Sequence, residues 1–308
     1  MRIAIFGCGA MGSIYAGLLA SAGHELIGID RNQAHVDAIN TSGLRVTGAS
    51  GDRCVAIQAY TEPPDVEVDL LVIAVKASHV GASSAARSLV KSTGSILTIQ
   101  NGLGSADVVA GVFGNERLIV GVAQGFGASL QAPGITHHND MKAIRMGDYT
   151  QGNSERLNSV VSIFQTSGFD TEAVNNIEVV QWEKLICNVA YSGPCALTGL
   201  TVGEVLDDPI VGPVSRAAAV EAWEVARRRS IPIAVDDPVA YVQGFAERMR
   251  SAKPSVLLDI EAGRRSEIDV INGAVEREAM RVDSFAPVNA TITALVRSLE
   301  ERTIADGN

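Results

Sequence analysis

The 308-residue sequence is poor in cysteine, and the spacing of its cysteines matches no recognisable motif. The four cysteines form no C-x-x-C pair and no Cys/His spacing typical of a metal site, so no bound metal is expected. Cys8 lies inside a glycine turn, where a disulfide would obstruct a ligand. These absences favour a reduced, cytoplasmic protein.

Basic residues are also in deficit, and long hydrophobic runs are missing. Lysine and arginine number 25 against 35 aspartates and glutamates, for a net charge of −10. This balance argues against nucleic acid or an anionic membrane as partner. No apolar run approaches the roughly 20 residues that span a bilayer, and Ile3–Phe6 is too short for a signal-peptide core. A small molecule, including an anionic one, stays possible as the partner.

The N-terminus carries the pattern of a dinucleotide-binding turn. A strand is predicted at Arg2–Phe6 and a helix at Ser13–Ala22, the context that a G-x-G-x-x-G match requires. In such a turn the three glycines permit the tight bend, the approach of a pyrophosphate and close helix packing, and the helix N-terminus offers unpaired N–H groups. The predicted cofactor-binding turn consists of Gly7, Cys8, Gly9, Ala10, Met11 and Gly12.

The residues after the second predicted strand, Glu25–Ile29, leave the choice of nucleotide open. Asp30 ends this strand where a carboxylate would bind the ribose 2′-OH of NAD. The neighbouring Arg31 could instead pair with the 2′-phosphate of NADP. Both residues are therefore candidates for cofactor binding.

Strands and helices alternate through the first half of the chain. Asp69–Val75 and Ser95–Ile99 are continuous apolar runs, as expected for parallel strands covered on both faces. Lys76 and Asn101 fall just past their carboxyl ends, where open α/β sheets bind ligands. Further strands are predicted at 117–122, 134–138 and 142–146, and a further helix at 154–166.

From about Asn175 onward the pattern changes to long helical periods with few strand signals. The sequence thus predicts an α/β N-terminal Rossmann-type dinucleotide-binding domain over residues 1–175 and an all-α C-terminal substrate or catalytic domain over residues 176–308. The boundary is expected near Val174–Ile177. No repeat and no low-complexity linker separates the two.

Three polar residues recur every fourth position in an otherwise apolar helical segment. Lys184, Asn188 and Ser192 would share one stripe of that helix. A solvated helix edge accounts for this spacing, because lysines are mostly exposed. The alternative is a lysine that lines a cleft, where a proton donor is useful.

A second polar cluster surrounds Glu267 and also has two interpretations. Ser266 and Asp269 suggest a helix N-cap with a variant capping box, which would place Glu267 in the first helical turn. Alternatively, Glu267 belongs to an active site.

The chain resembles the ketopantoate reductase (2-dehydropantoate 2-reductase) family over essentially its whole length. The motifs that carry this resemblance follow in order: Gly7–Gly12, Ala74–Ala77, Gln100–Gly104, Trp182–Leu185, Asn188, Ser255 with Asp259, Gly263–Arg264, Glu267–Asp269, Asn272–Gly273 and Ala286–Asn289.

The resemblance implies a Rossmann domain, a helical domain and an active site in the cleft between them. It makes Lys184 the general acid that protonates a ketone oxygen and places Glu267 in the active-site hydrogen bonding. Asn101 would position cofactor and substrate, and Lys76 would bind cofactor. It assigns Asn188 to the substrate hydroxyl and Ser255 to the substrate carboxylate. The implied reaction reduces a 2-oxo acid to a 2-hydroxy acid, as ketopantoate to pantoate, with NADP as the family's usual cofactor and NAD possible because of Asp30.

Three departures from the family pattern bear on the substrate. Ser192, Val202 and Ala252 stand where the resemblance leads one to expect asparagines, and Ser192 is still counted among the substrate-binding candidates. A pocket short of amide partners would accept a different, less polar 2-oxo acid. Two other functions remain: another two-domain dehydrogenase, and a non-catalytic nucleotide sensor, which would not need both Lys184 and Glu267. The expected partner is a small-molecule 2-oxo acid, and a homodimer is possible.

Overall fold

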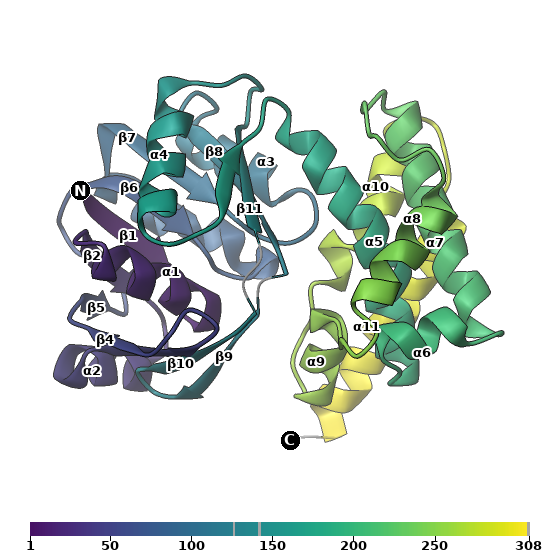
Figure 1. The fold of residues 1–308 in the computed structure, drawn as a ribbon, viewed down its shortest axis with the longest axis horizontal. Helices are drawn as coiled ribbons and strands as arrows, with labels where there is room; N and C mark the ends of the chain where they lie inside the picture. Colours follow the sequence, from purple (N-terminus) through teal and green to yellow (C-terminus); the bar gives the residue numbers. More distant parts are fainter. Residues whose placement is uncertain (126, 141–142, 307–308) are drawn as a thin grey trace. The chain divides into compact units, whose positions relative to one another are not determined.

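The computed structural model describes residues 1–125, 127–140 and 143–306. It divides into two compact units (Figure 1). The first unit comprises residues 1–100 and 105–177, and the second comprises residues 101–104 together with the chain from Glu178 onward. The short segment 101–104 therefore packs with residues that come far later in the sequence.

The first unit is built on an eight-stranded sheet in the order β12-β11-β8-β7-β6-β1-β2-β5. All neighbours are parallel except β11, which is antiparallel to β8. The chain runs outward from β1 in one direction and from β6 in the other, so the switch point lies between these two strands. The strands are β1 (Arg2–Phe6), β2 (Glu25–Ile29), β5 (Gln58–Tyr60), β6 (Val68–Ile73), β7 (Val90–Thr98), β8 (Leu118–Gln124), β11 (Ala143–Asp148) and β12 (Thr171–Ala173).

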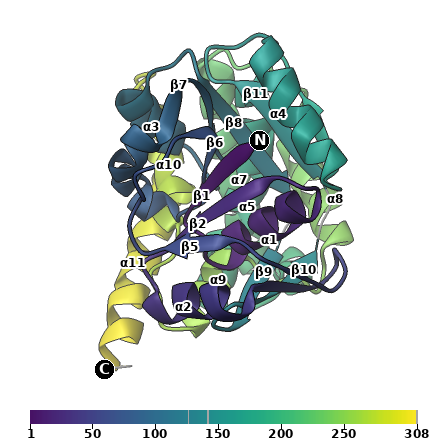
Figure 2. The ribbon, with the colours of Figure 1, turned by 90° about the vertical axis from the view of Figure 1, so that its left-hand side faces the viewer.

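Helices cover both faces of this sheet (Figure 2). One face packs against α1 (Ala10–Ser21) and α4 (Glu155–Thr166), and the other against η1 (Ala77–Leu89), a run of 3₁₀ turns, and α3 (Ser105–Phe113). The predicted Rossmann fold of the N-terminal half is confirmed. Double coverage explains the continuous apolar run in β6, because side chains on both of its faces are buried.

A second, four-stranded sheet in the order β4-β3-β10-β9 was not foreseen as a layer, although one of its strands was predicted at 134–138. It packs on α1 at a glycine: a Cβ on Gly17 would lie 2.5 Å from Val46 Cγ2 of β3. Its elements are β3 (Leu44–Gly48), β4 (Arg53–Val55), β9 (Gly127–Ala132) and β10 (Ile135–Asp140), and α2 (Gln33–Ser42) precedes β3.

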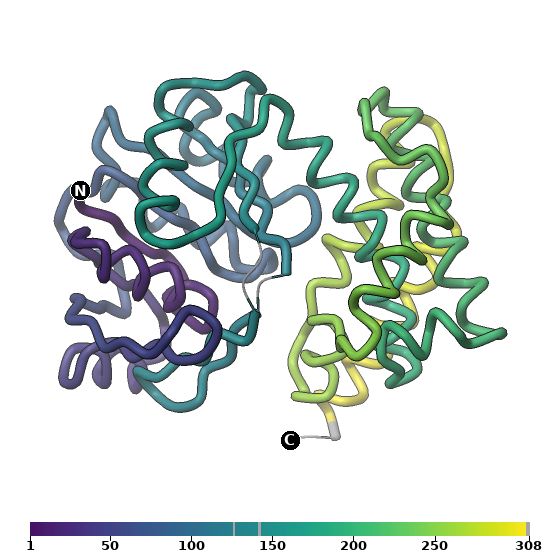
Figure 3. Tube along the Cα trace, viewed as in Figure 1, coloured from purple at the N-terminus to yellow at the C-terminus, as the bar shows by residue number. Residues whose placement is uncertain are grey.

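The last part of the first unit leaves β11, turns through α4 and returns in β12 (Figure 3). The predicted strand 142–146 corresponds to β11, but Lys142 lies outside the described residues. Ser154, the first residue of the predicted helix 154–166, is the N-cap of α4, and its side chain accepts a hydrogen bond from Leu157 N–H.

The second unit is helical, and its described residues contain no strand, as the sequence predicts. Its core surrounds Trp182, which is fully buried. The helices are α5 (Ile177–Thr198), α6 (Val202–Asp207), α7 (Val211–Arg228), α8 (Pro238–Arg248), α9 (Ser255–Glu261), the short 3₁₀ helix η2 (Ile268–Val270), α10 (Asn272–Met280) and α11 (Pro287–Asp306).

Two fully buried asparagines join four helices of this unit. Asn272 Nδ2 donates to the Val189 carbonyl of α5 at 3.1 Å and to Asn289 Oδ1 at 2.9 Å. Asn289 Nδ2 donates in turn to the Ala218 carbonyl and to the Glu221 carboxylate of α7. The same carboxylate accepts the N–H groups of the first turn of α11. These motif residues therefore set the packing of the helix that carries Lys184.

Replacing Asn272 with alanine should lower the free energy of unfolding by roughly 2–4 kcal/mol, because two buried acceptors lose their donor. Urea denaturation followed by circular dichroism measures this loss. Ser298→Ala, at an exposed position on α11, is the matched control and should leave the midpoint unchanged. A midpoint for Asn272→Ala equal to that of the control would contradict the structural role of the network.

Candidate active site

The turn after β1 can be built only with glycine at two positions. Gly7 has φ of 95°, and a Cβ there would lie 2.5 Å from Val75 N, beyond the end of β6. A Cβ on Gly12 would lie 2.1 Å from Gly7 O. The turn therefore closes tightly at the switch point, between the carboxyl ends of β1 and β6.

The N-terminus of α1 has the features of an anion-binding helix end. Gly9 is its N-cap, no side chain caps the helix, and its first turn, with Ala10 and Met11, holds no acidic residue. Amides at such an end are offered to a phosphate group. These residues fit the pyrophosphate of a dinucleotide. Cys8 takes no part as a thiolate, because its burial raises the thiol pKa to about 12.

The residues after β2 lie beside this turn. A Cβ on Gly9 would lie 3.4 Å from Asp30 Oδ2, and Asp30 Oδ1 accepts a hydrogen bond from Asn32 N–H at 2.9 Å. Arg31 Nη1 lies 3.5 Å from His79 Nε2, in the segment that follows β6. Lys76 is exposed and lies between β6 and η1, immediately before the first residue of η1. The structure thus brings the ends of β2 and β6 together around the glycine turn.

Two residues of this region were given no role by the sequence analysis. The Gln100 side chain donates to the carbonyls of Ile73 at 2.7 Å and Val75 at 3.1 Å, and so ties the end of β7 to the end of β6. His35 is buried and hydrogen-bonds to the Cys8 carbonyl at 2.9 Å. Its spacing with Val36 and Ile39 on the apolar face of α2 is the one sequence signal that could have placed it inside.

The segment that begins at Asn101 docks on the second unit through its backbone. Leu103 N–H donates to the Val270 carbonyl at 2.9 Å, and the Leu103 side chain lies in the core of that unit. Gly102 has φ of 75°, and a Cβ there would lie 2.0 Å from the same carbonyl oxygen. Any other residue at position 102 would push the segment away from η2.

This docking brings together three of the predicted site residues. Lys184 Nζ donates to Asn101 Oδ1 at 2.7 Å, and Asn101 Nδ2 donates to Glu267 Oε2 at 3.4 Å. The amide thus joins a cation and a carboxylate, with its acceptor toward the first and its donor toward the second. One hydrogen-bonded chain runs through residues that are 83 and 166 positions apart in the sequence.

The burial of Lys184 and the charge of Glu267 together set the pKa of the lysine. Burial lowers the pKa of the Lys184 ammonium to about 8, and the negative charge of Glu267 opposes this shift. Lys184 is half-buried and its ammonium donates to Asn101, which a fully solvated helix edge does not explain. A lysine with this pKa can both give and take a proton near neutral pH.

The remaining predicted substrate residues differ in their surroundings. Asn188 is half-buried one turn after Lys184, and Ser192 is 4% exposed one turn further on. Within the described part of the chain, no hydrogen bond to the Asn188 side chain is found. Ser255 is exposed at the first position of α9 and forms no hydrogen bond with Asn101, Lys184 or Glu267. The structure therefore connects Asn188 and Ser192 with Lys184 through α5, but not Ser255.

The capping-box interpretation of Ser266 and Asp269 is wrong. Only a single 3₁₀ turn follows Glu267, and α10 begins later, at Asn272. Ser266 Oγ accepts from Ile268 N–H at 3.2 Å, whereas Asp269 binds Arg297 Nε at 2.5 Å. Asp269 is thus held by α11 and does not reach back to a helix start.

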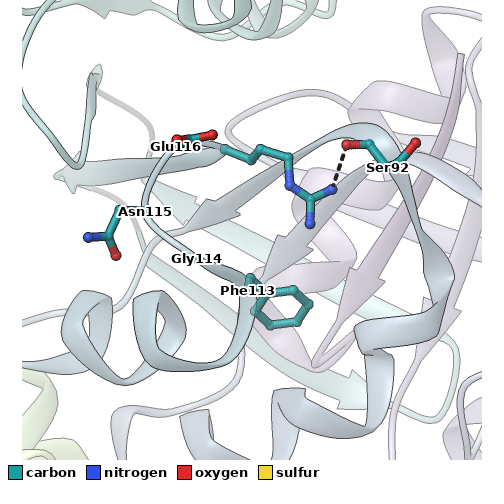
Figure 4. A pocket seen from close by; sticks show the side chains of 6 residues that line it. Ser92, Phe113, Gly114, Asn115 and Glu116 are labelled. Atoms are coloured by element: carbon teal, nitrogen blue, oxygen red, sulfur yellow. Dashed lines mark hydrogen bonds between the residues drawn. The ribbon is translucent and has the colours of Figure 1, made fainter.

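A surface hollow of about 700 Å³ in the first unit is unrelated to these residues (Figure 4). It is lined by Ser92 and residues 113–117, and Arg117 Nη1 donates to the Ser92 carbonyl at 3.2 Å. It lies near the start of β7 and just before β8, which is the amino end of both strands. Ligands of open α/β sheets bind at the opposite, carboxyl edge.

Comparison with known proteins matches both halves of the chain to one family. Residues 3–151 match the family model "Ketopantoate reductase PanE/ApbA", and residues 176–300 match its C-terminal counterpart. The chain belongs to the ketopantoate reductase family. It is 32% identical to the 2-dehydropantoate 2-reductase of Pyrococcus abyssi, over 97% of this chain and 98% of that protein.

Solved structures agree with this assignment. A PanE/ApbA family ketopantoate reductase from Ralstonia eutropha JMP134 is 30% identical with a TM-score of 0.90, over 98% of this chain and 99% of that one. The fold is also that of a D-mandelate dehydrogenase solved with NADH and anilino(oxo)acetate, at 24% identity, a TM-score of 0.89 and coverage of 98% and 99%. Among the described residues, no helix is long and apolar enough to cross a membrane, and no His/Cys/Asp/Glu group could hold a metal ion.

The arrangement predicts the effect of Glu267 on its neighbour. Glu267→Gln should lower the Lys184 pKa below 8, because it removes the charge that favours the ammonium while keeping an acceptor for Asn101. The chain has only five lysines, so ¹³C-dimethylated side chains can be assigned and titrated by NMR. Glu183→Gln, at the residue beside Lys184, should leave this pKa unchanged because Glu183 accepts from Ala234 N–H instead. An unchanged or raised pKa in Glu267→Gln would contradict the coupling.

Proposed function

We propose that this chain reduces a 2-oxo acid to the 2-hydroxy acid with a reduced nicotinamide dinucleotide, and that Lys184 is the proton donor. The observation that carries the proposal is the Lys184–Asn101–Glu267 chain, in which a lysine of lowered pKa is hydrogen-bonded to an amide and coupled to a carboxylate. Membership of the ketopantoate reductase family supports it. A nucleotide sensor has no use for such a lysine.

The glycine turn is the part of the chain that would hold the cofactor. The amides at the start of α1 bind the pyrophosphate, and Gly7 and Gly12 allow the backbone to approach it. The nicotinamide supplies the hydride when it is bound. We place Lys76 and Asp30 beside the cofactor because both lie at carboxyl ends of strands that flank the turn.

Lys184 acts on the oxygen of the ketone. As the carbonyl carbon is reduced, negative charge develops on its oxygen, and an ammonium beside it stabilises that charge and transfers a proton. Asn101 Oδ1 accepts a hydrogen bond from one of the three N–H groups of Lys184, and this bond fixes the direction of the other two. Glu267 keeps the lysine protonated against the effect of burial. Asn188 and Ser255 are assigned to the substrate hydroxyl and carboxylate, as the family pattern implies.

Replacing Lys184 with alanine should lower kcat by about 10²–10⁴-fold and leave the affinity for the cofactor nearly unchanged, because only proton donation is lost. Lys253→Ala is the matched control, since Lys253 is exposed in the same unit and pairs with Glu261. Steady-state kinetics on folded, purified variants measure both effects. Near-normal turnover in Lys184→Ala would overturn the assignment.

We propose NADP as the preferred cofactor, with NAD as the alternative because of Asp30. The Arg31 guanidinium, close to His79, makes no ion pair in the described part of the chain and is available to a 2′-phosphate. Asp30 lies beside Gly9 and opposes a second negative charge there. Arg31 therefore favours NADP and Asp30 favours NAD, and we give the greater weight to Arg31.

Arg31→Ala should raise KM for NADPH by about tenfold or more and change KM for NADH little, since a charge-assisted pair is lost only with the phosphorylated cofactor. Both cofactors are to be compared on both proteins. A wild-type protein that strongly prefers NADH, with a nearly silent arginine change, would show that Asp30 governs.

The substrate we propose is a 2-oxo acid with an apolar side chain, such as a branched or aryl one. Val202 N–H donates to the Ala252 carbonyl at 3.0 Å, so two of the positions where the family has asparagines are adjacent. Both side chains are apolar, and Val202 is buried. The third position, Ser192, carries a short side chain on the Lys184 stripe. A pocket with these residues offers few partners for a substrate hydroxyl.

The expected result is that kcat/KM for 2-oxoisovalerate or phenylglyoxylate at least equals that for ketopantoate. The preference should be broad, because an apolar pocket discriminates by only about 1–3 kcal/mol per methylene group. Val202→Asn combined with Ala252→Asn should shift the ratio toward ketopantoate. A wild-type advantage for ketopantoate above about 10³-fold would rule out this pocket.

Two further expectations from the sequence stay predictions. We propose a cytoplasmic protein, because its cysteines show no disulfide pattern, and a homodimer, which light scattering on the purified protein can test.

A further inference from the structure

We infer that His35 is a positioning residue for the cofactor-binding turn: its imidazole, together with the Ser13 hydroxyl, orients the peptide between Cys8 and Gly9 for the pyrophosphate. The inference rests on the proposed dinucleotide-dependent function. It concerns a residue that neither touches the reacting atoms nor lies near them in sequence.

The hydrogen bonds of His35 fix its tautomer. Gly134 N–H donates to Nδ1 at 2.9 Å, so Nδ1 carries no proton. The proton of the neutral ring is then on Nε2, which donates to the Cys8 carbonyl at 2.9 Å. His35 thus connects the glycine turn after β1 with the turn between β9 and β10, and both connections lie within the first unit.

The Cys8 carbonyl receives a second donor from inside α1. Ser13 Oγ donates to it at 3.0 Å, and Ser13, His35 and Cys8 itself are at most 1% exposed. Cys8 N–H donates to the Ile29 carbonyl at 2.9 Å. Both polar backbone groups of Cys8 are therefore held, and its carbonyl points into the buried interior.

The planarity of the peptide unit carries this orientation to the next residue. The C=O and N–H of a trans peptide point in opposite directions, so a carbonyl held toward the interior turns the Gly9 N–H away from it. Gly9 is the uncapped N-cap of α1, where a phosphate would accept from backbone amides. Two buried side chains thus preset an amide that would otherwise have to reorient when the cofactor binds.

Two substitutions separate the two hydrogen bonds of the ring. Asparagine at position 35 can place its carbonyl oxygen near the site of Nδ1 and keep the Gly134 contact, but it loses the donor to Cys8. Glutamine can place its amide nitrogen near the site of Nε2 and keep the donor to Cys8. His24→Asn is the control, because His24 is half-buried in the turn at the far end of α1.

The test is the dissociation constant of NADPH or NADH, measured by calorimetry, together with kcat at saturating cofactor. His35→Asn should weaken binding about tenfold, whereas His35→Gln and His24→Asn should stay within about threefold of wild type. The value of kcat and the KM of the 2-oxo acid should not change. Equal losses in the asparagine and glutamine variants, or unchanged binding in His35→Asn, would overturn the inference.

If His35→Asn fails to fold, Ser13→Ala provides a second test of the same inference. It removes the second donor to the same carbonyl and leaves the Gly134 contact in place, so it should also weaken cofactor binding without lowering kcat. Unchanged binding in Ser13→Ala would count against the inference. A wild-type protein that binds neither cofactor would refute the proposed function itself, whereas tight wild-type binding with no effect in any variant would refute only the role of His35.

Discussion

The hydrogen-bonded amide of Asn101 is the constraint on which the candidate active site depends. It bonds to both the Lys184 ammonium and the Glu267 carboxylate, and the charge of Glu267 raises the pKa of the lysine. Its position follows from the backbone: segment 101–104 is held by the Val270 carbonyl, at a distance that only glycine at position 102 allows. Burial lowers the pKa of the Lys184 ammonium that this amide contacts.

In the first unit, backbone contacts likewise shape the glycine turn that would bind the cofactor. Glycines at positions 7 and 12 close the turn between β1 and α1 against the end of β6, and Gln100 ties β6 to β7 just before the segment that carries Asn101. Two consecutive residues thus have separate roles. Gln100 orders the carboxyl edge of the sheet, and Asn101 orders the proton donor of the proposed reaction.

Local patterns in the sequence predicted what local physics decides. The glycine turn, the acidic end of β2 and the stripe of Lys184 and Asn188 follow from short-range periodicity, and the structure contains each of them. The contact of Asn101 with Lys184 spans 83 residues and had only the family resemblance to suggest it. The capping pattern at Ser266 misled because a distant Arg297 binds Asp269. The small sheet was missed because β3 pairs with β10 far along the chain, and β4 is only three residues long.

The central claim is that Lys184 protonates the ketone oxygen, and the pH dependence of hydride transfer tests it most directly. Single-turnover reduction is to be followed from about pH 6 to about pH 10, with the reverse oxidation measured on the same protein. The reduction rate should be level below a pKa of about 8 and fall about tenfold per pH unit above it, because the neutral amine has no proton to give. The oxidation rate should rise through the same pKa. A reduction rate that stays level up to about pH 10 would contradict the assignment of Lys184 as the acid.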